Sequence, residues 1–467
     1  MVYGLGTILG QSISFLMLPI YTRVFGPAGY GVIEMLTVIA GLLGTLIVMG
    51  TDSAQSFHFF KEKKQGIAAQ RSIISSVLLW RLVWGLGTVL TFYCFGPVIN
   101  RMFFEGKLSQ TYFAVAFAGG MLTILIQQSI DVTRLLMRPW RFVGINTLLS
   151  VTTASSVMFF AVYKGLGVLG YVIGVSTAAS VGCLFSWWSI REYLCLDRAL
   201  VKLWPKLLRF GAPLLPSTLS LYLMSSSDRW FIQHYAGEVE VGIYSIGAKF
   251  GLIMALAVQV FRRAWWPIAL DSMHAGDGPE TFRIISRLFV GFGSAAAVYV
   301  GFLAPFLIDK FTGPGFEGSM TIVAILAWQA FFYGLYAVGS AGIWKAEKTY
   351  MNSVLMSISA AINLGLNYLL VPSYGGIGAA LGTVIAYLSW ALSSIIVSER
   401  LWRVDFPKGL LGAQIIIAMA VSAWSLNYDG GFWAKAIVVH VVLAGVIITA
   451  FNKEMVRSIW KHDGRES

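Results

Sequence analysis

Residues 376–397 read GIGAALGTVIAYLSWALSSIIV, and this run decides the fold class because none of its 22 residues is charged. An apolar helix of about 20 residues crosses the hydrocarbon core of a bilayer, which is roughly 30 Å thick. Similar runs follow one another along the chain, so that 57% of its 467 residues are hydrophobic and only 12% are charged. A soluble domain carries roughly 25% charged residues. We therefore expect the chain to lie in a membrane.

The apolar runs are typical of helices. Within lipid, backbone groups are satisfied only in helices or in closed barrels, and barrel strands show short segments of alternating polarity. The runs in this sequence are continuous, and they predict an all-α polytopic membrane protein with about 14 transmembrane helices. The expected spans cover approximately residues 3–24, 32–56, 72–97, 110–133, 142–162, 168–190, 207–231, 242–264, 284–308, 318–343, 350–371, 376–397, 408–426 and 433–451.

The distribution of basic residues predicts the topology. The chain has 34 Lys and Arg against 22 Asp and Glu, a net charge of +12. Small groups of basic residues separate the apolar runs instead of forming one basic domain, which argues against nucleic acid as a partner. The connections after even-numbered spans, together with the C-terminal tail, hold 25 of the 34 basic residues. Because basic loops stay in the cytoplasm, we expect both termini on that side.

Cysteine and histidine are few and dispersed. Cys94, Cys183 and Cys195 lie in or beside apolar runs without a CxxC motif, and the five histidines are scattered. Neither distribution is typical of a disulfide framework or of a metal site. We expect no metal and no cofactor, although transport could be coupled to a proton or sodium gradient.

Glycine-bearing turns recur at one spacing. The segment GPAGYGVI from Gly26 aligns with GEVEVGIY from Gly237, and the Gly-Leu-Gly turn at 165–167 aligns with the Gly-Ile-Gly turn at 376–378. Both pairs are 211 residues apart, which indicates that spans 1–6 and 7–12 are two copies of one unit. An even number of spans in each copy makes a parallel repeat, as in transporters whose site lies between two halves.

This repeat predicts three parts of the chain. Residues 1–200 are expected to form an N-terminal six-helix lobe and residues 201–405 a pseudo-symmetric C-terminal six-helix lobe. Residues 406–467 then hold transmembrane helices 13 and 14 and a cytoplasmic tail. Pro213 and Pro216 fall early in the seventh span, where each removes a helix donor, so we expect a bend there.

Charged residues within the spans are the candidate site residues. Such a charge costs at least about 2.5 kcal/mol on insertion scales and usually faces a cavity or a partner. Arg81 lies well inside span 3 and Lys249 well inside span 8, while Arg23 and Arg229 occupy the ends of spans 1 and 7. Together they predict a cationic groove suited to phosphate. Arg23 and Arg229 could instead extend to the membrane interface.

Acidic residues within the spans are few and lie toward span ends. Asp52 and Asp228 are the candidates for a proton or cation site, if transport is coupled to an ion gradient. Asp131 precedes Arg134 by three residues on one helix face, so these two side chains could pair with each other.

Four stretches resemble a known family. They are LPIYTRVFGPAGYGVIEM from Leu18, DRWFIQHYAGEVEVGIYSIGAKFG from Asp228, FRRAWWPIAL from Phe261 and NYLLVPSYGGIGAALGTVIAY from Asn367. In this order they resemble the polysaccharide transporter family, the lipid-linked oligosaccharide (O-antigen type) flippases of the multidrug/oligosaccharidyl-lipid/polysaccharide exporter superfamily. Arg23, Asp228, Arg229 and Lys249 fall within these stretches, whereas Arg81 rests on its depth alone.

The resemblance implies a V-shaped pair of lobes around a cationic cavity. By alternating access it would carry an undecaprenyl-pyrophosphate-linked oligosaccharide across the bacterial cytoplasmic (inner) membrane for cell-surface polysaccharide biosynthesis. The expected partners are this polyprenyl-pyrophosphate-linked glycan and membrane lipid. A monomer is expected, with polysaccharide assembly proteins as potential companions.

Two other functions stay open. A multidrug and toxin extrusion antiporter of the same superfamily would need a site for organic cations, usually with carboxylates inside the membrane. A membrane-embedded glycan polymerase or ligase would need a sizeable external loop with catalytic residues. No connection between the expected spans exceeds about twenty residues, which favours a protein that is not an enzyme.

Overall fold

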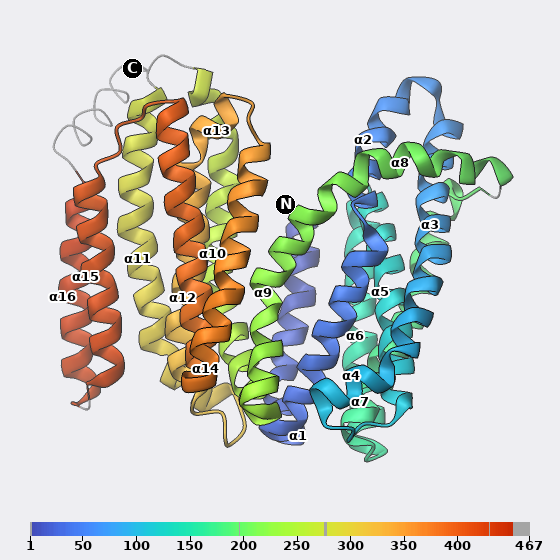
Figure 1. Ribbon diagram of the computed structural model, residues 1–467, viewed down its shortest axis with the longest axis horizontal. Helices are drawn as coiled ribbons and strands as arrows, with labels where there is room; N and C mark the ends of the chain where they lie inside the picture. Colours follow the sequence, from blue (N-terminus) through green and yellow to red (C-terminus); the bar gives the residue numbers. More distant parts are fainter. Residues whose placement is uncertain (1, 196, 275–277, 429, 452–467) are drawn as a thin grey trace. The chain divides into compact units, whose positions relative to one another are not determined.

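The computed structural model describes residues 2–195, 197–274, 278–428 and 430–451, and these residues are almost entirely helical (Figure 1). Packing divides the chain into two units. Unit 1 comprises Met1–Gly242 with Phe311–Gly315, and unit 2 comprises Ile243–Lys310 with Phe316–Ser467. These units follow spatial contacts, whereas the lobes expected from the sequence follow a duplication. The lobe boundary at residue 200 therefore stays a prediction.

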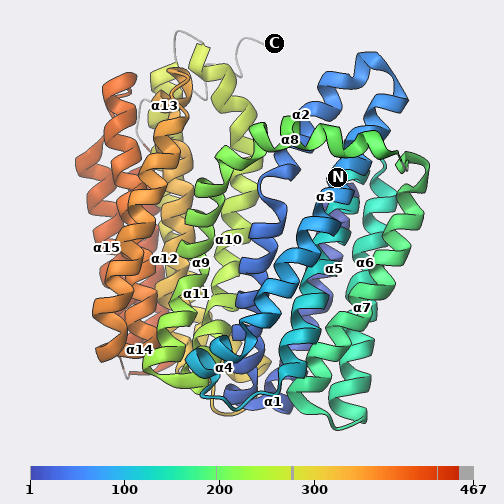
Figure 2. The ribbon, with the colours of Figure 1, turned by 45° about the vertical axis from the view of Figure 1, so that its right-hand side comes forward.

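Within the described residues, unit 1 contains the first nine α-helices and the first turns of the tenth. They are α1 (Val2–Val48), α2 (Thr51–Lys61), α3 (Ile67–Cys94), α4 (Gly96–Phe104), α5 (Gln110–Leu135), α6 (Pro139–Val157), α7 (Gly167–Ile190), α8 (Trp204–Gly211), α9 (Leu215–Tyr235) and the start of α10 (Gly237–His274). Helix α5 packs against α3 and α7, and α6 packs against α7 (Figure 2). Small side chains permit the close α5–α7 approach: the Ser176 hydroxyl lies over Gly119 and donates to the Val115 carbonyl oxygen at 2.9 Å.

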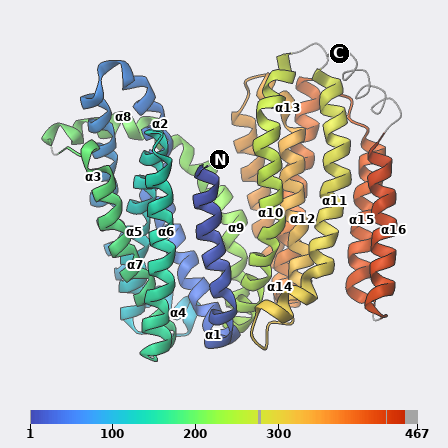
Figure 3. The ribbon, with the colours of Figure 1, turned by 180° about the vertical axis from the view of Figure 1, so that it is seen from behind.

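Unit 2 contains the rest of α10 and the remaining helices. They are α11 (Gly278–Phe311), α12 (Ser319–Gly339), α13 (Ala341–Lys345), α14 (Tyr350–Leu401), α15 (Lys408–Asn427) and α16 (Phe432–Ala450). The last two helices form a pair beside α11 (Figure 3). There the Tyr299 ring of α11 meets the His440 ring of α16 with 5.2 Å between ring centroids.

The described residues form eleven helical segments that are long and apolar enough to cross a membrane. Three of the eleven consist of two arms: α1 is kinked at Gly26 (φ 60°), α14 is kinked at Gly375 (φ 53°), and Gly237 (φ 81°) separates α9 from α10. Glycine adopts positive φ without a steric penalty, which explains the glycine at each turn. Counting both arms gives fourteen spans over the described residues, in agreement with the predicted number.

The proline pair interrupts its span as predicted. Helix α8 ends at Gly211, a short 3₁₀ turn covers Ala212–Leu214, and α9 begins at Leu215. Pro213 lies in the turn and Pro216 in the first turn of α9. Proline lacks the amide donor that an uninterrupted helix would need at these positions. After this interruption, α9 packs against α1.

Two glycines of unit 1 meet backbone to backbone. A Cβ atom at Gly31 would lie 1.8 Å from the Glu238 carbonyl oxygen, and one at Gly242 would lie 2.0 Å from the Pro27 carbonyl oxygen. Gly31 and Gly242 are 211 residues apart, and so are Pro27 and Glu238, which is the spacing of the sequence repeat. Each copy thus makes the same contact with the other, as in a self-complementary two-fold interface. This reciprocity supports the duplication.

Candidate functional site

Helix α9 packs along the second arm of α1, residues 27–48, within unit 1. The Tyr222 hydroxyl of α9 donates to the Val38 carbonyl oxygen. Gly41 makes room for this ring, because a Cβ atom there would lie 2.9 Å from the Tyr222 hydroxyl oxygen. The Tyr222 side chain therefore crosses from α9 to the backbone of α1 at close range.

A cluster of ionisable side chains lies at this helix pair. Tyr30 is hydrogen-bonded to Glu34, one turn further along α1. The positive charge of Arg229 interacts electrostatically with both Tyr30 and Tyr222. We call Tyr30, Glu34, Tyr222, Asp228 and Arg229 the α1–α9 cluster. Glu34 is 8% exposed and Asp228 only 1% exposed. Buried charge is expensive unless it is compensated, so this concentration marks the leading candidate for a functional site.

Arg229 is held partly by its own helix. Its Nη1 atom donates to the Ser225 carbonyl oxygen at 2.9 Å, and the side chain is half-buried. A guanidinium has five N–H donors in a planar fork. Arg229 is the predicted cationic residue that belongs to the α1–α9 cluster.

A cavity of about 320 Å³ lies beside the same arm of α1, between α1, α5 and α7 of unit 1. Its walls are mostly apolar, with the hydroxyls of Thr37, Thr123 and Ser176 among the lining groups. Such a volume lies at the small end of ligand pockets. Sequence reasoning missed this cavity. The available signal was the adjacent pair Gly119 and Gly120 within a predicted span.

Arg81 is enclosed within unit 1. Its side chain is 1% exposed, its Nε atom donates to Thr51 Oγ1 at 3.3 Å, and Nη1 donates to the Ile124 carbonyl oxygen at 3.4 Å. Its positive charge interacts electrostatically with the carboxylates of Asp131 and, more weakly, of Asp52. The guanidinium thus links α3 to α2 and α5. A direct contact with a substrate would require this packing to open.

The other predicted site residues are distributed between the two units. Arg23 is exposed on the first arm of α1, and Asp52 is exposed in the first turn of α2, where the helix dipole favours an acidic side chain. Lys249 is half-buried on α10 in unit 2. A groove shared by Arg23, Arg229 and Lys249 stays a prediction. Asp131 forms the expected ion pair with Arg134.

Lys107, in the connection between α4 and α5, lies near Glu238, the residue whose carbonyl oxygen meets Gly31. Lys107 Nζ lies 2.9 Å from Glu105 Oε2 and 3.9 Å from Glu238 Oε1. The hydrogen bond to Glu105, and next the charge of Glu238, raise the pKa of the Lys107 ammonium. Exposed pairs of this kind contribute little to stability. The contact nevertheless places basic charge next to Glu238.

The sequence pattern of the family described as "Polysaccharide biosynthesis protein" matches residues 1–273, more than half of the chain. The chain belongs to this family. Among curated relatives of this family member, protein 1 of the Lsg locus of Haemophilus influenzae is 23% identical over 284 residues. That match covers 58% of the chain and 65% of the Haemophilus protein, so the chain spans slightly less than two thirds of that relative's length.

Solved structures share the fold of this polysaccharide biosynthesis family member. The inward closed conformation of the lipid II flippase MurJ superposes with a TM-score of 0.73 at 15% identity and covers 99% of both chains. An inward-facing MATE family multidrug resistance transporter of the MOP superfamily gives a TM-score of 0.60 at 16% identity, covering 85% of this chain and 98% of that one. The predicted all-helical membrane fold is confirmed, and the family match agrees with the predicted role in polysaccharide biosynthesis.

Proposed function

We propose that this chain is a flippase that carries an undecaprenyl-pyrophosphate-linked oligosaccharide across the bacterial cytoplasmic membrane for cell-surface polysaccharide biosynthesis. The observation that carries the proposal is the match of 99% of the chain to the fold of a lipid II flippase, in a chain that belongs to a polysaccharide biosynthesis family. Translocation makes and breaks no covalent bond, so no catalytic residue is required.

The proposed mechanism assigns the pyrophosphate to basic side chains. Arg229 offers its planar fork to phosphate oxygens, and Arg23 and Lys249 supply further positive charge. The polyprenyl tail stays in lipid while the headgroup and glycan pass through the protein by alternating access. We assign Arg81 a supporting role, because its partners are Thr51 and the Ile124 carbonyl group.

Arg229→Ala is expected to reduce translocation of a labelled polyprenyl-pyrophosphate glycan in proteoliposomes by roughly ten- to hundredfold, the equivalent of a hydrogen bond to a charged group. Arg229→Lys keeps the positive charge but loses the planar fork of N–H donors. Its translocation rate should therefore lie between those of the wild type and Arg229→Ala. Arg403→Ala is the matched control, since Arg403 is exposed and pairs only with Asp405 at 2.7 Å among the described residues. An unchanged rate for Arg229→Ala would remove Arg229 from the proposed passage.

Asp228 is the proposed coupling carboxylate, because it is 1% exposed whereas Asp52 is exposed. Asp228→Asn is expected to make translocation insensitive to an imposed proton or sodium gradient, since an amide neither titrates nor attracts a cation strongly. Asp52→Asn should keep the wild-type response. Retention of gradient dependence in Asp228→Asn, with loss in Asp52→Asn, would reverse the assignment.

A MATE-type cation antiporter is the second candidate. The buried carboxylates Glu34 and Asp228 favour it, and so does the fold shared with a MATE transporter. Proteoliposomes separate the two candidates, because an antiporter accumulates an organic cation against an opposing gradient and a flippase does not.

We further propose that both termini are cytoplasmic and that the protein acts as a monomer. The accessibility of an added terminal cysteine to an impermeant reagent would test the position of the termini.

A further inference from the structure

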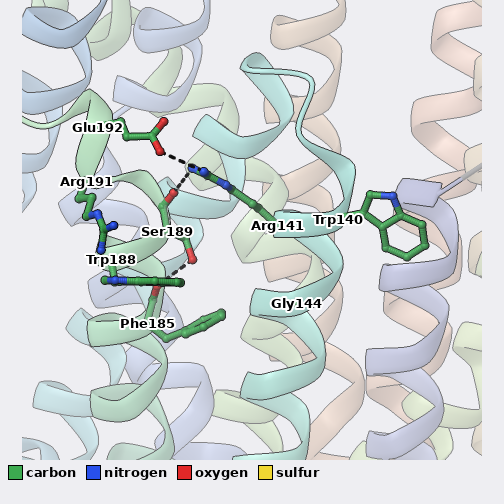
Figure 4. A pocket seen from close by; sticks show the side chains of 8 residues that line it. All are labelled: Trp140, Arg141, Gly144, Phe185, Trp188, Ser189, Arg191 and Glu192. Atoms are coloured by element: carbon green, nitrogen blue, oxygen red, sulfur yellow. Dashed lines mark hydrogen bonds and ion pairs between the residues drawn. The ribbon is translucent and has the colours of Figure 1, made fainter.

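A second pocket lies in unit 1 where α6 begins and α7 ends, and it plays no part in the proposed translocation. Its volume is about 310 Å³. The 3₁₀ turn η3 (Arg191–Tyr193) follows α7 and contributes the end of one wall. Figure 4 shows the lining residues, which are Trp140, Arg141, Gly144, Phe185, Trp188, Ser189, Arg191 and Glu192.

Two arginines fix one wall of this pocket through a single carboxylate. Arg141 reaches from α6 to donate to the Ser189 carbonyl oxygen and, at 3.1 Å, to Glu192 Oε1 (Figure 4). Arg138 donates to the other oxygen, Glu192 Oε2, at 3.0 Å. Both oxygens of Glu192 are therefore engaged, and its negative charge is shared between two guanidinium groups.

Arg191 supplies the positive charge that this carboxylate does not balance. Its guanidinium carbon lies over the Trp188 ring, 5.0 Å from the ring centre (Figure 4). No carboxylate of the described residues forms an ion pair with Arg191. A guanidinium stacked on an aromatic face keeps its edge N–H groups available. The pocket thus has a net positive rim with oriented donors.

The rest of the pocket is apolar and belongs to the membrane interface. Trp140 is 74% exposed and Trp188 is 58% exposed, as expected for aromatic residues at the headgroup level. The Phe185 ring stacks on Trp188 with 5.8 Å between centroids, on the side toward the span. Gly144 leaves the floor open, because a Cβ atom there would meet no atom within 4 Å.

We infer that this pocket binds the phosphate headgroup of an anionic phospholipid of the surrounding bilayer. Arg191, at the rim, would bind the phosphate. The first carbons of the acyl chain would pack against Phe185 and Gly144. A free phosphate ion would gain nothing from the apolar floor, whereas a lipid matches both parts and is held at high local concentration by the membrane. The bound lipid would anchor the ends of α6 and α7 at the interface.

The test compares lipid retention by the full chain and three variants in nanodiscs that contain phosphatidylglycerol and phosphatidylcholine. Native mass spectrometry after release should show phosphatidylglycerol retained preferentially by the wild type. Arg191→Gln is expected to lower this retention roughly fivefold, the effect of one basic contact with an anionic bilayer. Gly144→Leu should lower it by filling the floor without a backbone clash.

Gly87→Leu is the matched control, because a Cβ atom at this exposed position of α3 also meets no atom within 4 Å. Equal retention of phosphatidylglycerol by the wild type, Arg191→Gln and Gly144→Leu would overturn the inference. Thermal stabilisation by inorganic phosphate that matches stabilisation by phosphatidylglycerol would also overturn it, since the site would then be one for free anions. Neither readout depends on translocation.

Discussion

Gly31→Ala is expected to lower the thermal stability of the protein sharply and to abolish translocation. The new Cβ atom would lie 1.8 Å from the Glu238 carbonyl oxygen, a backbone atom that no rotamer change can move. The second arm of α1 and the start of α10 must separate to admit it. Forcing extra atoms into a packed contact costs about 1–3 kcal/mol, and occasionally more. The measurement is the melting temperature in detergent, with the translocation rate in proteoliposomes.

Gly242→Ala should have a comparable effect, because its Cβ atom would lie 2.0 Å from the Pro27 carbonyl oxygen. The loss of stability in the double variant should be smaller than the sum of the losses in the two single variants, because both substitutions disrupt the same contact. Gly87→Ala provides the control in open space, where helix propensity favours alanine over glycine. Wild-type stability in Gly31→Ala would show that the two backbones do not approach this closely.

Arg81→Ala is expected to destabilise unit 1 by about 2–5 kcal/mol, as for other large-to-small changes in a core. The change removes the donor to Thr51 and to the Ile124 carbonyl oxygen and leaves a cavity between α2, α3 and α5. Arg81→Met keeps most of the volume without the donors, so the difference between the two variants isolates the packing contribution. Unfolding in detergent followed by circular dichroism or by a melting assay provides the measurement.

Translocation per folded molecule decides which role Arg81 has. If Arg81 acts through packing, Arg81→Ala should lose stability and translocation together, and a lower assay temperature should recover part of the rate. A variant with wild-type stability and no translocation would instead support the direct substrate contact that the sequence predicted. The two readouts therefore separate the buried guanidinium as a structural link from the same group as a phosphate ligand.

The spans could be predicted because the length of an apolar run reports directly on the thickness of the bilayer. The sequence predicts one span at residues 376–397, and these residues form the second arm of α14 after the kink at Gly375. The glycine turns are also readable, because positive φ favours glycine at these positions. Span lengths and turn positions are local properties of the chain.

The partners of the buried polar groups could not be predicted in the same way. The position of Arg81 within an apolar run is evident from the sequence, but its contacts come from Thr51 and Ile124, which belong to other helices. In lipid, both the packed and the exposed faces of a helix are apolar, so polarity does not reveal which way a side chain points. For the same reason, neither the contact of Tyr222 with Val38 nor the position of Arg191 over Trp188 could be predicted from residue polarity.

The reciprocal meeting of Gly31 with Glu238 and of Gly242 with Pro27 has an evolutionary consequence. On the predicted duplication, a six-helix ancestor would have made this contact between two separate copies, with one glycine from each. A single mutation in such an ancestor would change the interface twice. In the fused chain the two positions can change independently of one another, and both hold glycine.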